Sequence, residues 1–271
     1  MHHPDPASTD GAPDLTYTGG KLERAFLLES LRDFFDDQLI TDVLYKVKGG
    51  KEANVYCCAA HPDTGVGLLA AKVYRPEAFR AMKNDGLYRL GREEVSADGK
   101  AIRDKRALRA MHKRTKTGRA MRSASWLQHE YRTLCDLFDA GADVPEPISL
   151  NEHTIVMKFV GDASRAAPTL HEVGLNHGEA RQLFDDLIRN VALMLDTHRI
   201  HGDLSPYNVL YDAGRAVVID LPQCVDPHTH PQAYALLTRD VERLCTYFAR
   251  QGVDRDPHLV TADLWQRCVR R

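Results

Sequence analysis

The segment HGDLSPYNVL, which runs from His201 to Leu210, constrains the fold of this chain more than any other part of its sequence. Asn208 lies five positions after Asp203, and Asp220 ends the apolar run AVVID twelve positions further on. Phosphoryl transfer needs a carboxylate that receives or orients the proton of the nucleophile, and oxygen ligands that hold Mg²⁺ against the phosphates. The segment supplies all three groups. In the alternative interpretation, Asp203 caps a turn and Asp220 only ends a strand.

The elements around this segment predict an α+β chain with two lobes. From Lys21 to about Leu39, apolar residues recur at mostly helical spacing and predict an amphipathic helix. Two β-rich runs around a Gly-Gly turn, and a third run GLLAAKVY, predict three antiparallel strands. Later, TIVMKFVG predicts a buried strand and GEARQLFDDLIRNVALMLDTHRI a long amphipathic helix. A β-rich N-lobe followed by a reduced, α-rich C-lobe is the outline of a protein-kinase-like fold.

The predicted organisation has three parts. Residues 1–20 are rich in Pro, Gly, Asp and Ser, and we expect them to form a disordered tail. Residues 21–160 are expected to form the N-lobe, and residues 161–271 the C-lobe with the catalytic loop. Near residues 80–124 the periodicity is lost, which indicates a basic insertion or loosely packed helices. After it, Ser125 is expected to cap a helix that Gly141 ends.

Two features of the N-terminal half point to phosphate binding. In GGKEANVY, the small residues Gly49, Gly50 and Ala53 allow backbone N–H groups to approach phosphates, although alone the run predicts no more than a hairpin turn. Lys72 lies in the apolar run AAKVY, where an ammonium without an anion is costly to bury. We expect its anions to be ATP phosphates and Glu130, which we place near solvent. In the alternative interpretation both side chains simply reach water.

Several runs together resemble the RIO family of atypical serine/threonine protein kinases. They are GKEANVY, AAKVYRP, SWLQHEYRTL, VPEPI, TIVMKFVG, HGDLSPYNVL and IDLPQCVDPHTHPQAYALLTRD. The resemblance extends from about Lys21 to Phe248, and favours the type without a winged-helix domain because about twenty residues precede the first predicted helix. It implies ATP and Mg²⁺ as cofactors, and transfer of phosphate to Ser or Thr, with the share of plain ATP hydrolysis left open.

The resemblance also implies roles for individual residues. The implied catalytic residues are Asp203, Lys72 and Glu130, and the implied metal ligands are Asn208 and Asp220. The implied ATP-binding residues are Gly49, Gly50, Lys51, Glu52, Ala53, Lys72, Met157, Lys158 and Val160. His201 is implied to be structural rather than a base. Gly202 stands where ordinary kinases carry the Arg that reads a phosphorylated activation loop, so control by such phosphorylation is not expected.

Charge and composition limit the partners that we expect. The formal net charge of -2 implies no nucleic-acid or membrane partner for the chain as a whole. The stretch from Arg89 to Arg122, however, has twelve Lys or Arg against four Asp or Glu. It is either a surface for RNA or a ribosomal particle, or a solvated loop. The absence of a long apolar run and of a CxxC pair favours the cytoplasm, and we expect Cys57 and Cys58 to face opposite sides of a strand.

Three functions remain open at this level. The first is a RIO-type protein kinase. The second is a small-molecule phosphotransferase of the aminoglycoside or choline kinase kind, whose loop is similar to HGDLSPYN, although GKEANVY, IDLPQ and the short C-terminal part favour the first. The third is a nucleotide-gated scaffold for ribosome assembly, in which catalysis only times release.

Overall fold

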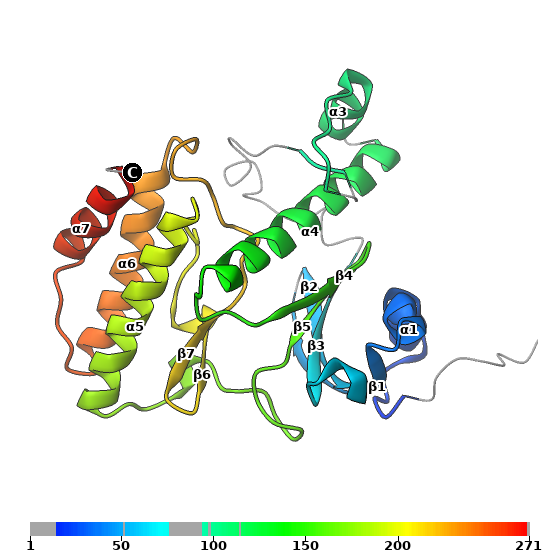
Figure 1. Cartoon of the computed structure of the whole chain (residues 1–271), viewed down its shortest axis with the longest axis horizontal. Helices are drawn as coiled ribbons and strands as arrows, with labels where there is room; N and C mark the ends of the chain where they lie inside the picture. The colour runs from blue at the N-terminus through cyan, green and yellow to red at the C-terminus, as the bar shows by residue number, and fades with distance from the viewer. Residues whose placement is uncertain (1–14, 51, 76–93, 97–98, 114, 270–271) are drawn as a thin grey trace, which may run out of the picture.

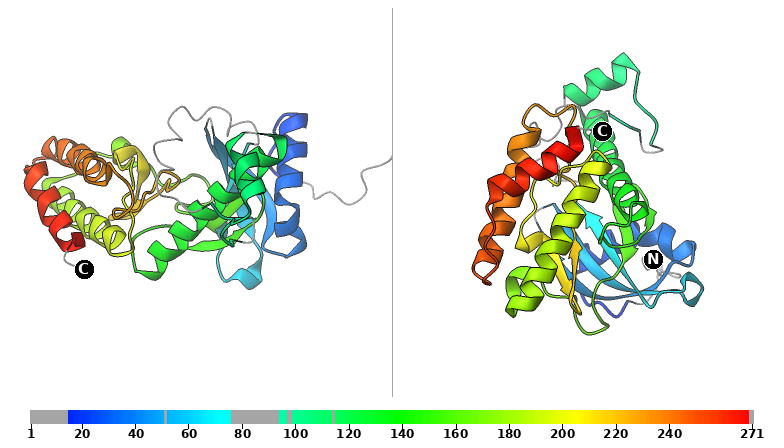
Figure 2. Two further views of the ribbon diagram at one scale, coloured as in Figure 1. Left: turned by 90° about the horizontal axis from the view of Figure 1, so that it is seen from above. Right: turned by 60° about the vertical axis from the view of Figure 1, so that its left-hand side comes forward.

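The computed structural model describes residues 15–50, 52–75, 94–96, 99–113 and 115–269, and it has two lobes (Figure 1; Figure 2). Lys51, one of the implied ATP-binding residues, lies outside the described residues, as do residues 1–14 of the predicted tail and Arg89, Arg92 and Arg114 of the basic stretch. One lobe is built on a five-stranded sheet and the other on three long helices, so the predicted two-lobed α+β architecture is confirmed. The first lobe contains α1 (Lys21–Asp36), β1 (Ile40–Gly49), β2 (Ala53–Ala60), η1 (Pro62–Thr64), β3 (Leu68–Tyr74), α3 (Lys105–His112), α4 (Lys116–Asp139), β4 (Pro147–Leu150) and β5 (Thr154–Lys158). The second contains η3 (Leu170–Glu172), α5 (His177–Asp196), η4 (Pro206–Asn208), β6 (Val209–Asp212), β7 (Arg215–Val218), α6 (Ala233–Ala249) and α7 (Pro257–Val269).

The sheet of the first lobe is antiparallel, with the strand order β1-β2-β3-β5-β4. Its two faces are buried by different parts of the molecule. Cys58 belongs to the apolar cluster that packs under α1, and Cys57 belongs to a separate cluster with Ala70 and Phe159. The two thiols therefore lie on opposite faces of β2, as the alternation of a strand requires, and this prediction is confirmed.

The predicted tail is too long at its C-terminal end. Leu15 is buried in the cluster under α1, and the N–H of Tyr17 donates to the carbonyl of Val43 at 2.8 Å. The N–H and hydroxyl of Thr16 both donate to the Asp42 carboxylate, at 2.9 and 2.6 Å. The composition of this segment hid these contacts, because each depends on β1, which comes later in the chain.

The helix that Ser125 was predicted to cap begins ten residues earlier than expected, at Lys116. Thr115 caps it by accepting the N–H of Gly118 at 3.1 Å, whereas the Ser125 hydroxyl lies inside the helix and accepts the N–H of Val95 at 3.0 Å. A Cβ on Gly118 would come within 2.0 Å of the Ala110 carbonyl oxygen, so glycine is required where α3 and α4 touch. The early turns of α4 project beyond the sheet toward α3 (Figure 1), which explains why they lack the apolar periodicity used to predict the helix.

In the second lobe, α5, α6 and α7 pack against one another and share one apolar cluster with the β6-β7 hairpin. The predicted apolar face of α5 is buried, at Leu183, Leu187, Val191, Met194 and Leu195. The same apolar cluster includes residues of α4, so one apolar core connects the second lobe with this helix of the first lobe. Among the helices of the described ranges, none combines the length and the apolar character that a membrane crossing requires.

Candidate active site

A cavity of about 850 Å³ lies between the two lobes and contains most of the residues implied to bind nucleotide. This volume is typical of a pocket for a small ligand. Gly49, which ends β1, does not line it, and Asp203 lies outside its lining as well. The predicted site residues that do line it are Gly50, Glu52, Ala53, Lys72, Glu130, Met157, Lys158, Val160, Asn208 and Asp220.

Lys72 joins the two lobes through ion pairs. Its Nζ lies 2.7 Å from Glu130 Oε1 of α4 and 2.6 Å from Asp220 Oδ1, and the Tyr74 hydroxyl donates to the other oxygen of Glu130. Burial opposes the charge of Lys72, but Asp220 and Glu130 together hold its pKa well above the ordinary value. Glu130 is only 4% exposed, so the expectation that it lies near solvent was wrong, because α4 presses it against β3 and Tyr74.

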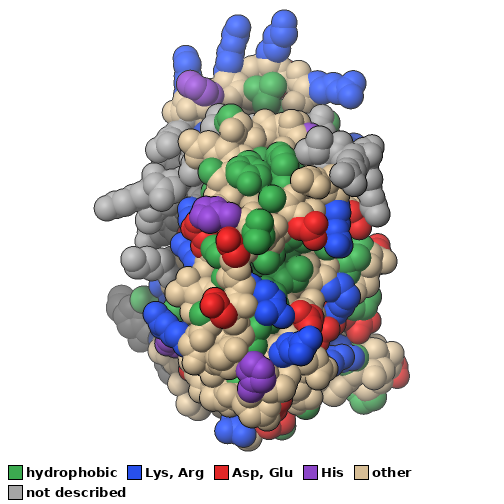
Figure 3. All heavy atoms as spheres, turned by 90° about the vertical axis from the view of Figure 1, so that its left-hand side faces the viewer, with side chains coloured by type: hydrophobic (Ala, Val, Ile, Leu, Met, Phe, Trp, Pro, Cys, Tyr) green, Lys and Arg blue, Asp and Glu red, His purple; other side chains and the backbone are tan. Residues whose placement is uncertain are grey.

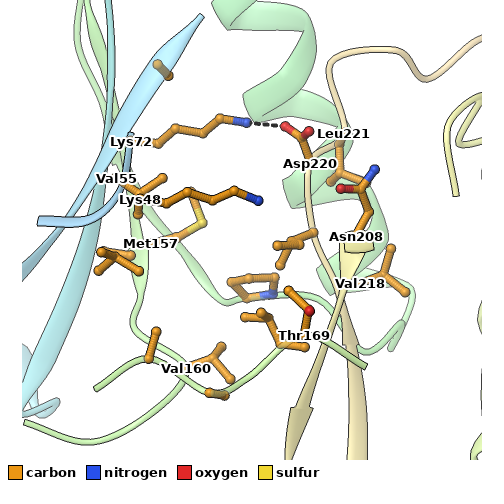
Figure 4. A pocket seen from close by; sticks show the side chains of 18 of the residues that line it. Lys48, Val55, Lys72, Met157, Val160, Thr169, Asn208, Val218, Asp220 and Leu221 are labelled. Atoms are coloured by element: carbon orange, nitrogen blue, oxygen red, sulfur yellow. Dashed lines mark hydrogen bonds and ion pairs between the residues drawn. The ribbon is translucent and has the colours of Figure 1, made fainter. Parts of the chain in front are cut away.

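Asp220 and Asn208 point into the cavity from the second lobe (Figure 4). Asp220 follows β7 with a φ of 70°, in the left-handed region that a non-glycine residue rarely adopts, and this conformation turns its carboxylate out of line with the strand. Lys72 is the main reason that the pKa of Asp220 lies below its ordinary value. Asn208 donates from Nδ2 to the Asp203 carbonyl at 2.9 Å, which leaves its Oδ1 as the oxygen available to a metal ion.

His201 holds the loop to the strand that carries Asp220. Its Nδ1 accepts the N–H of Asp203 at 3.2 Å, so its Nε2 is the protonated nitrogen and donates to the Ile219 carbonyl at 3.1 Å. Burial lowers the pKa of His201, which favours this neutral form. Both ring nitrogens are occupied, and the imidazole therefore has no lone pair left for general-base catalysis.

The segment after β5 offers hydrogen-bonding groups along the cavity wall. The N–H of Lys158 donates to the Glu146 carbonyl at 2.8 Å, and the carbonyl of Val160 accepts the N–H of Ala167 at 3.0 Å. The carbonyl of Lys158 and the N–H of Val160 belong to the same stretch of the cavity wall. Met157 precedes this pair and lies opposite Ala70 of β3, where it forms part of the apolar wall.

Comparison with known proteins identifies the family. A family model described as "RIO domain" matches residues 55–260, which include Lys72, Glu130, the catalytic loop and Asp220. The chain belongs to the RIO domain family. The resemblance read from the sequence motifs is thereby confirmed at the level of the family.

Curated relatives of this RIO domain chain carry the names of kinases. "Serine/threonine-protein kinase RIO1" of Chaetomium thermophilum is 34% identical over 227 residues, covering 80% of this chain and 41% of that protein. The protein of the same name from Homo sapiens is 32% identical over 217 residues, covering 79% and 34%. "RIO-type serine/threonine-protein kinase Rio1" of Haloferax volcanii is 34% identical over 218 residues, covering 78% and 64%. The chain thus spans less than two thirds of the length of each of these relatives.

Two residues of α6 that the sequence motifs did not predict hold the His201–Leu210 segment of this RIO domain in place. The buried carboxylate of Asp240 accepts the N–H groups of Gly202 and Leu204, at 2.7 and 3.1 Å. Arg243, one turn later, places its Nη1 2.7 Å from Asp203 Oδ1. The available signal was an acidic residue among the apolar positions of ALLTRDVERL, since a carboxylate on the buried face of a helix needs donors from elsewhere in the fold.

Proposed function

We propose that this RIO domain is an ATP- and Mg²⁺-dependent phosphotransferase that transfers the γ-phosphate to a Ser or Thr hydroxyl, with water as a competing acceptor. Three parts of the cavity support the proposal: a backbone donor and acceptor for a base, an ammonium for phosphates, and two oxygen ligands for a metal ion. How turnover divides between phosphate transfer and ATP hydrolysis is also part of the proposal. That division depends on which acceptor is present and not on the nucleotide cavity.

The adenine would contact the segment after β5. The carbonyl of Lys158 can accept from an exocyclic amino group, and the N–H of Val160 can donate to a ring nitrogen, which matches the donor and acceptor pattern of adenine. Apolar side chains, Met157 and Val55 among them, line the cavity beside these groups. Lys72 would bind the phosphates, because its ammonium already lies at the cavity surface between two carboxylates.

The donor set of the second lobe fits Mg²⁺. Asp220 supplies a carboxylate and Asn208 an amide oxygen, and Mg²⁺ is commonly held by one or two carboxylates together with substrate phosphates. In the described ranges no cluster of three His, Cys, Asp or Glu forms a complete metal cage of its own. When bound, Mg²⁺ would neutralise charge on the phosphates, and the protein would contribute the orientation of these two oxygens.

Asp203 would act on the acceptor. Arg243 occupies its Oδ1, and Asn208 Nδ2 lies 3.4 Å from its Oδ2, a weak contact that an acceptor hydroxyl can replace. Asp203 would orient this hydroxyl toward the γ-phosphorus and take its proton late, because phosphoryl transfer depends mainly on positioning and charge stabilisation. His201 and Asp240 would serve by fixing the backbone on both sides of Asp203.

The convergence of Lys72, Glu130 and Asp220 at one end of the cavity is the single observation that carries this proposal. The test is incubation of the purified chain with γ-labelled ATP and Mg²⁺. Label on protein Ser or Thr supports a kinase, and label only in free phosphate supports an ATPase. If neither product forms and ATP does not bind, the proposal is wrong.

The basic helix α3 favours nucleic-acid binding as a second property. Figure 3 shows Lys and Arg side chains projecting from the end of the molecule where α3 lies in Figure 1. Five cations of this region are exposed and form no ion pair with another described residue: Arg103, Lys105, Arg106, Arg109 and Lys113. We propose that they contact a phosphate backbone, for which clustered cations are the main source of affinity.

A further inference from the structure

Two lysines of β1 face opposite sides of the sheet although they are two residues apart. In a regular strand, residues i and i+2 share a face. Lys46 lies opposite Tyr56 in the pairing with β2, and Lys48 lies opposite Val55, because the register shifts between the two lysines. Such a bulge inserts one residue and re-aims the side chains that follow it.

The bulge turns Lys48 toward the nucleotide cavity. Tyr56 belongs to the cluster under α1, and on that face Lys46 Nζ pairs with Glu23 Oε1 of α1 at 2.8 Å. Val55 lines the cavity, as does Lys48 itself. Figure 4 shows the Lys48 side chain extending from β1 into the cavity, toward the wall that carries Asn208 and Asp220.

The ammonium of Lys48 has no ion pair or hydrogen bond with another described residue. Three carboxylates of the cavity lining are engaged with other groups: Lys72 binds both Glu130 and Asp220, and the Glu172 carboxylate accepts the N–H and hydroxyl of Thr169 at 2.7 and 2.8 Å. An ammonium that a bulge aims into a cavity beside a second lysine is placed to bind a multiply charged anion.

We propose that Lys48 is a second phosphate-binding cation of this site, which contacts the phosphate chain of the nucleotide from the β1 side while Lys72 contacts it from β3. The inference rests on the proposed function, since it assumes that a nucleotide occupies the cavity. It assigns a role to the bulge of β1, which without a ligand would only expose a lysine at the end of a strand.

Nucleotide affinity tests the inference without any need for turnover. The dissociation constants of ATP and adenosine are measured by calorimetry for the parent chain and for Lys48→Gln, Lys48→Arg and Lys46→Gln. Lys46→Gln is the matched control, because it removes the same charge from the same strand on the opposite face. A hydrogen bond between charged groups contributes enough that its loss weakens binding by about tenfold.

The expected result is that Lys48→Gln weakens ATP by about tenfold, leaves adenosine unchanged, and is largely rescued by Lys48→Arg, while Lys46→Gln stays within about twofold of the parent. Equal ATP affinity in the parent and in Lys48→Gln overturns the inference but leaves the proposed function standing. Equal weakening by Lys46→Gln and Lys48→Gln also overturns it, because a general charge effect then explains both. If the parent binds no ATP, the proposed function fails and the inference fails with it.

Discussion

Replacing Lys72 with Met should destabilise the fold as well as impair nucleotide use. The ammonium is the cation bound to Glu130, whose side chain is 6% exposed, and to Asp220, whose side chain is 47% exposed. After the substitution Asp220 can be solvated by water. Glu130 cannot, and in the described part of the chain it keeps only the hydroxyl of Tyr74 as a donor.

The expected loss follows from these two environments. Breaking a fully buried ion pair costs about 3–5 kcal/mol, chiefly because one charge stays buried without a partner. Since one carboxylate rehydrates and the other keeps a hydroxyl donor, we expect Lys72→Met to lower the free energy of unfolding by about 2 kcal/mol. Adding Glu130→Gln should recover part of this loss, because the substitution removes the buried charge itself.

Urea unfolding of the parent, the single variant and the double variant measures these differences. Lys158→Met is the control, because Lys158 Nζ lies 3.8 Å from Glu146 with both side chains exposed, and such a pair contributes at most about 1 kcal/mol. The reasoning is refuted if Lys72→Met unfolds at the same urea concentration as the parent, or if Glu130→Gln makes the loss larger.

Three further predictions test other parts of the account. Burial raises the pKa of Asp240 to about 7. From about pH 4 to pH 7 the folded chain therefore keeps a proton on Asp240 that the unfolded chain has lost. Because the folded chain binds the extra proton, Asp240 makes the free energy of unfolding fall as the pH rises through this range. The stability advantage of the parent over Asp240→Asn should therefore shrink between pH 5 and about pH 7 in urea unfolding and level off above it; a pH-independent difference contradicts this assignment. Asp220→Asn should raise the Mg²⁺ concentration needed for half-maximal turnover or abolish turnover, and an unchanged magnesium titration would exclude Asp220 as a ligand. If α3 and the residues that flank it bind RNA, Gln at the cations of this region should flatten the plot of log K against log salt by about 0.7–0.9 for each lost phosphate contact, whereas a slope near zero in the parent favours a solvated helix. The cations to replace are Arg103, Lys105, Arg106 and Arg109.

Much of the fold, and the pairing of Lys72 with Glu130, could be predicted from the sequence. The catalytic loop is one uninterrupted motif, and the strands and α5 show the periodicity of their burial. Lys72 needed an anion because its strand is apolar, and this argument led to Glu130 at a distance of 58 residues.

The misses depend on contacts between segments far apart in the chain. Asp240 and Arg243 of α6 contact the loop that contains Gly202 and Asp203, and the sequence of α6 alone does not predict which segment they contact. The burial of Glu130 depends on how closely α4 packs against β3, which helical periodicity does not determine.

The central claim, that Asp203 acts on the acceptor in an ATP-dependent transfer, is tested most directly by measuring ATP affinity and turnover on the same preparation of Asp203→Asn. The substitution keeps the shape of the side chain and removes its charge and its capacity to accept a proton. The account predicts that turnover falls by about 10²–10⁴-fold while ATP binding, which depends on Lys72, the segment after β5 and the metal ligands, stays within about threefold of the parent. If ATP affinity falls in step with turnover, Asp203 holds the metal or the fold, and its proposed role is wrong.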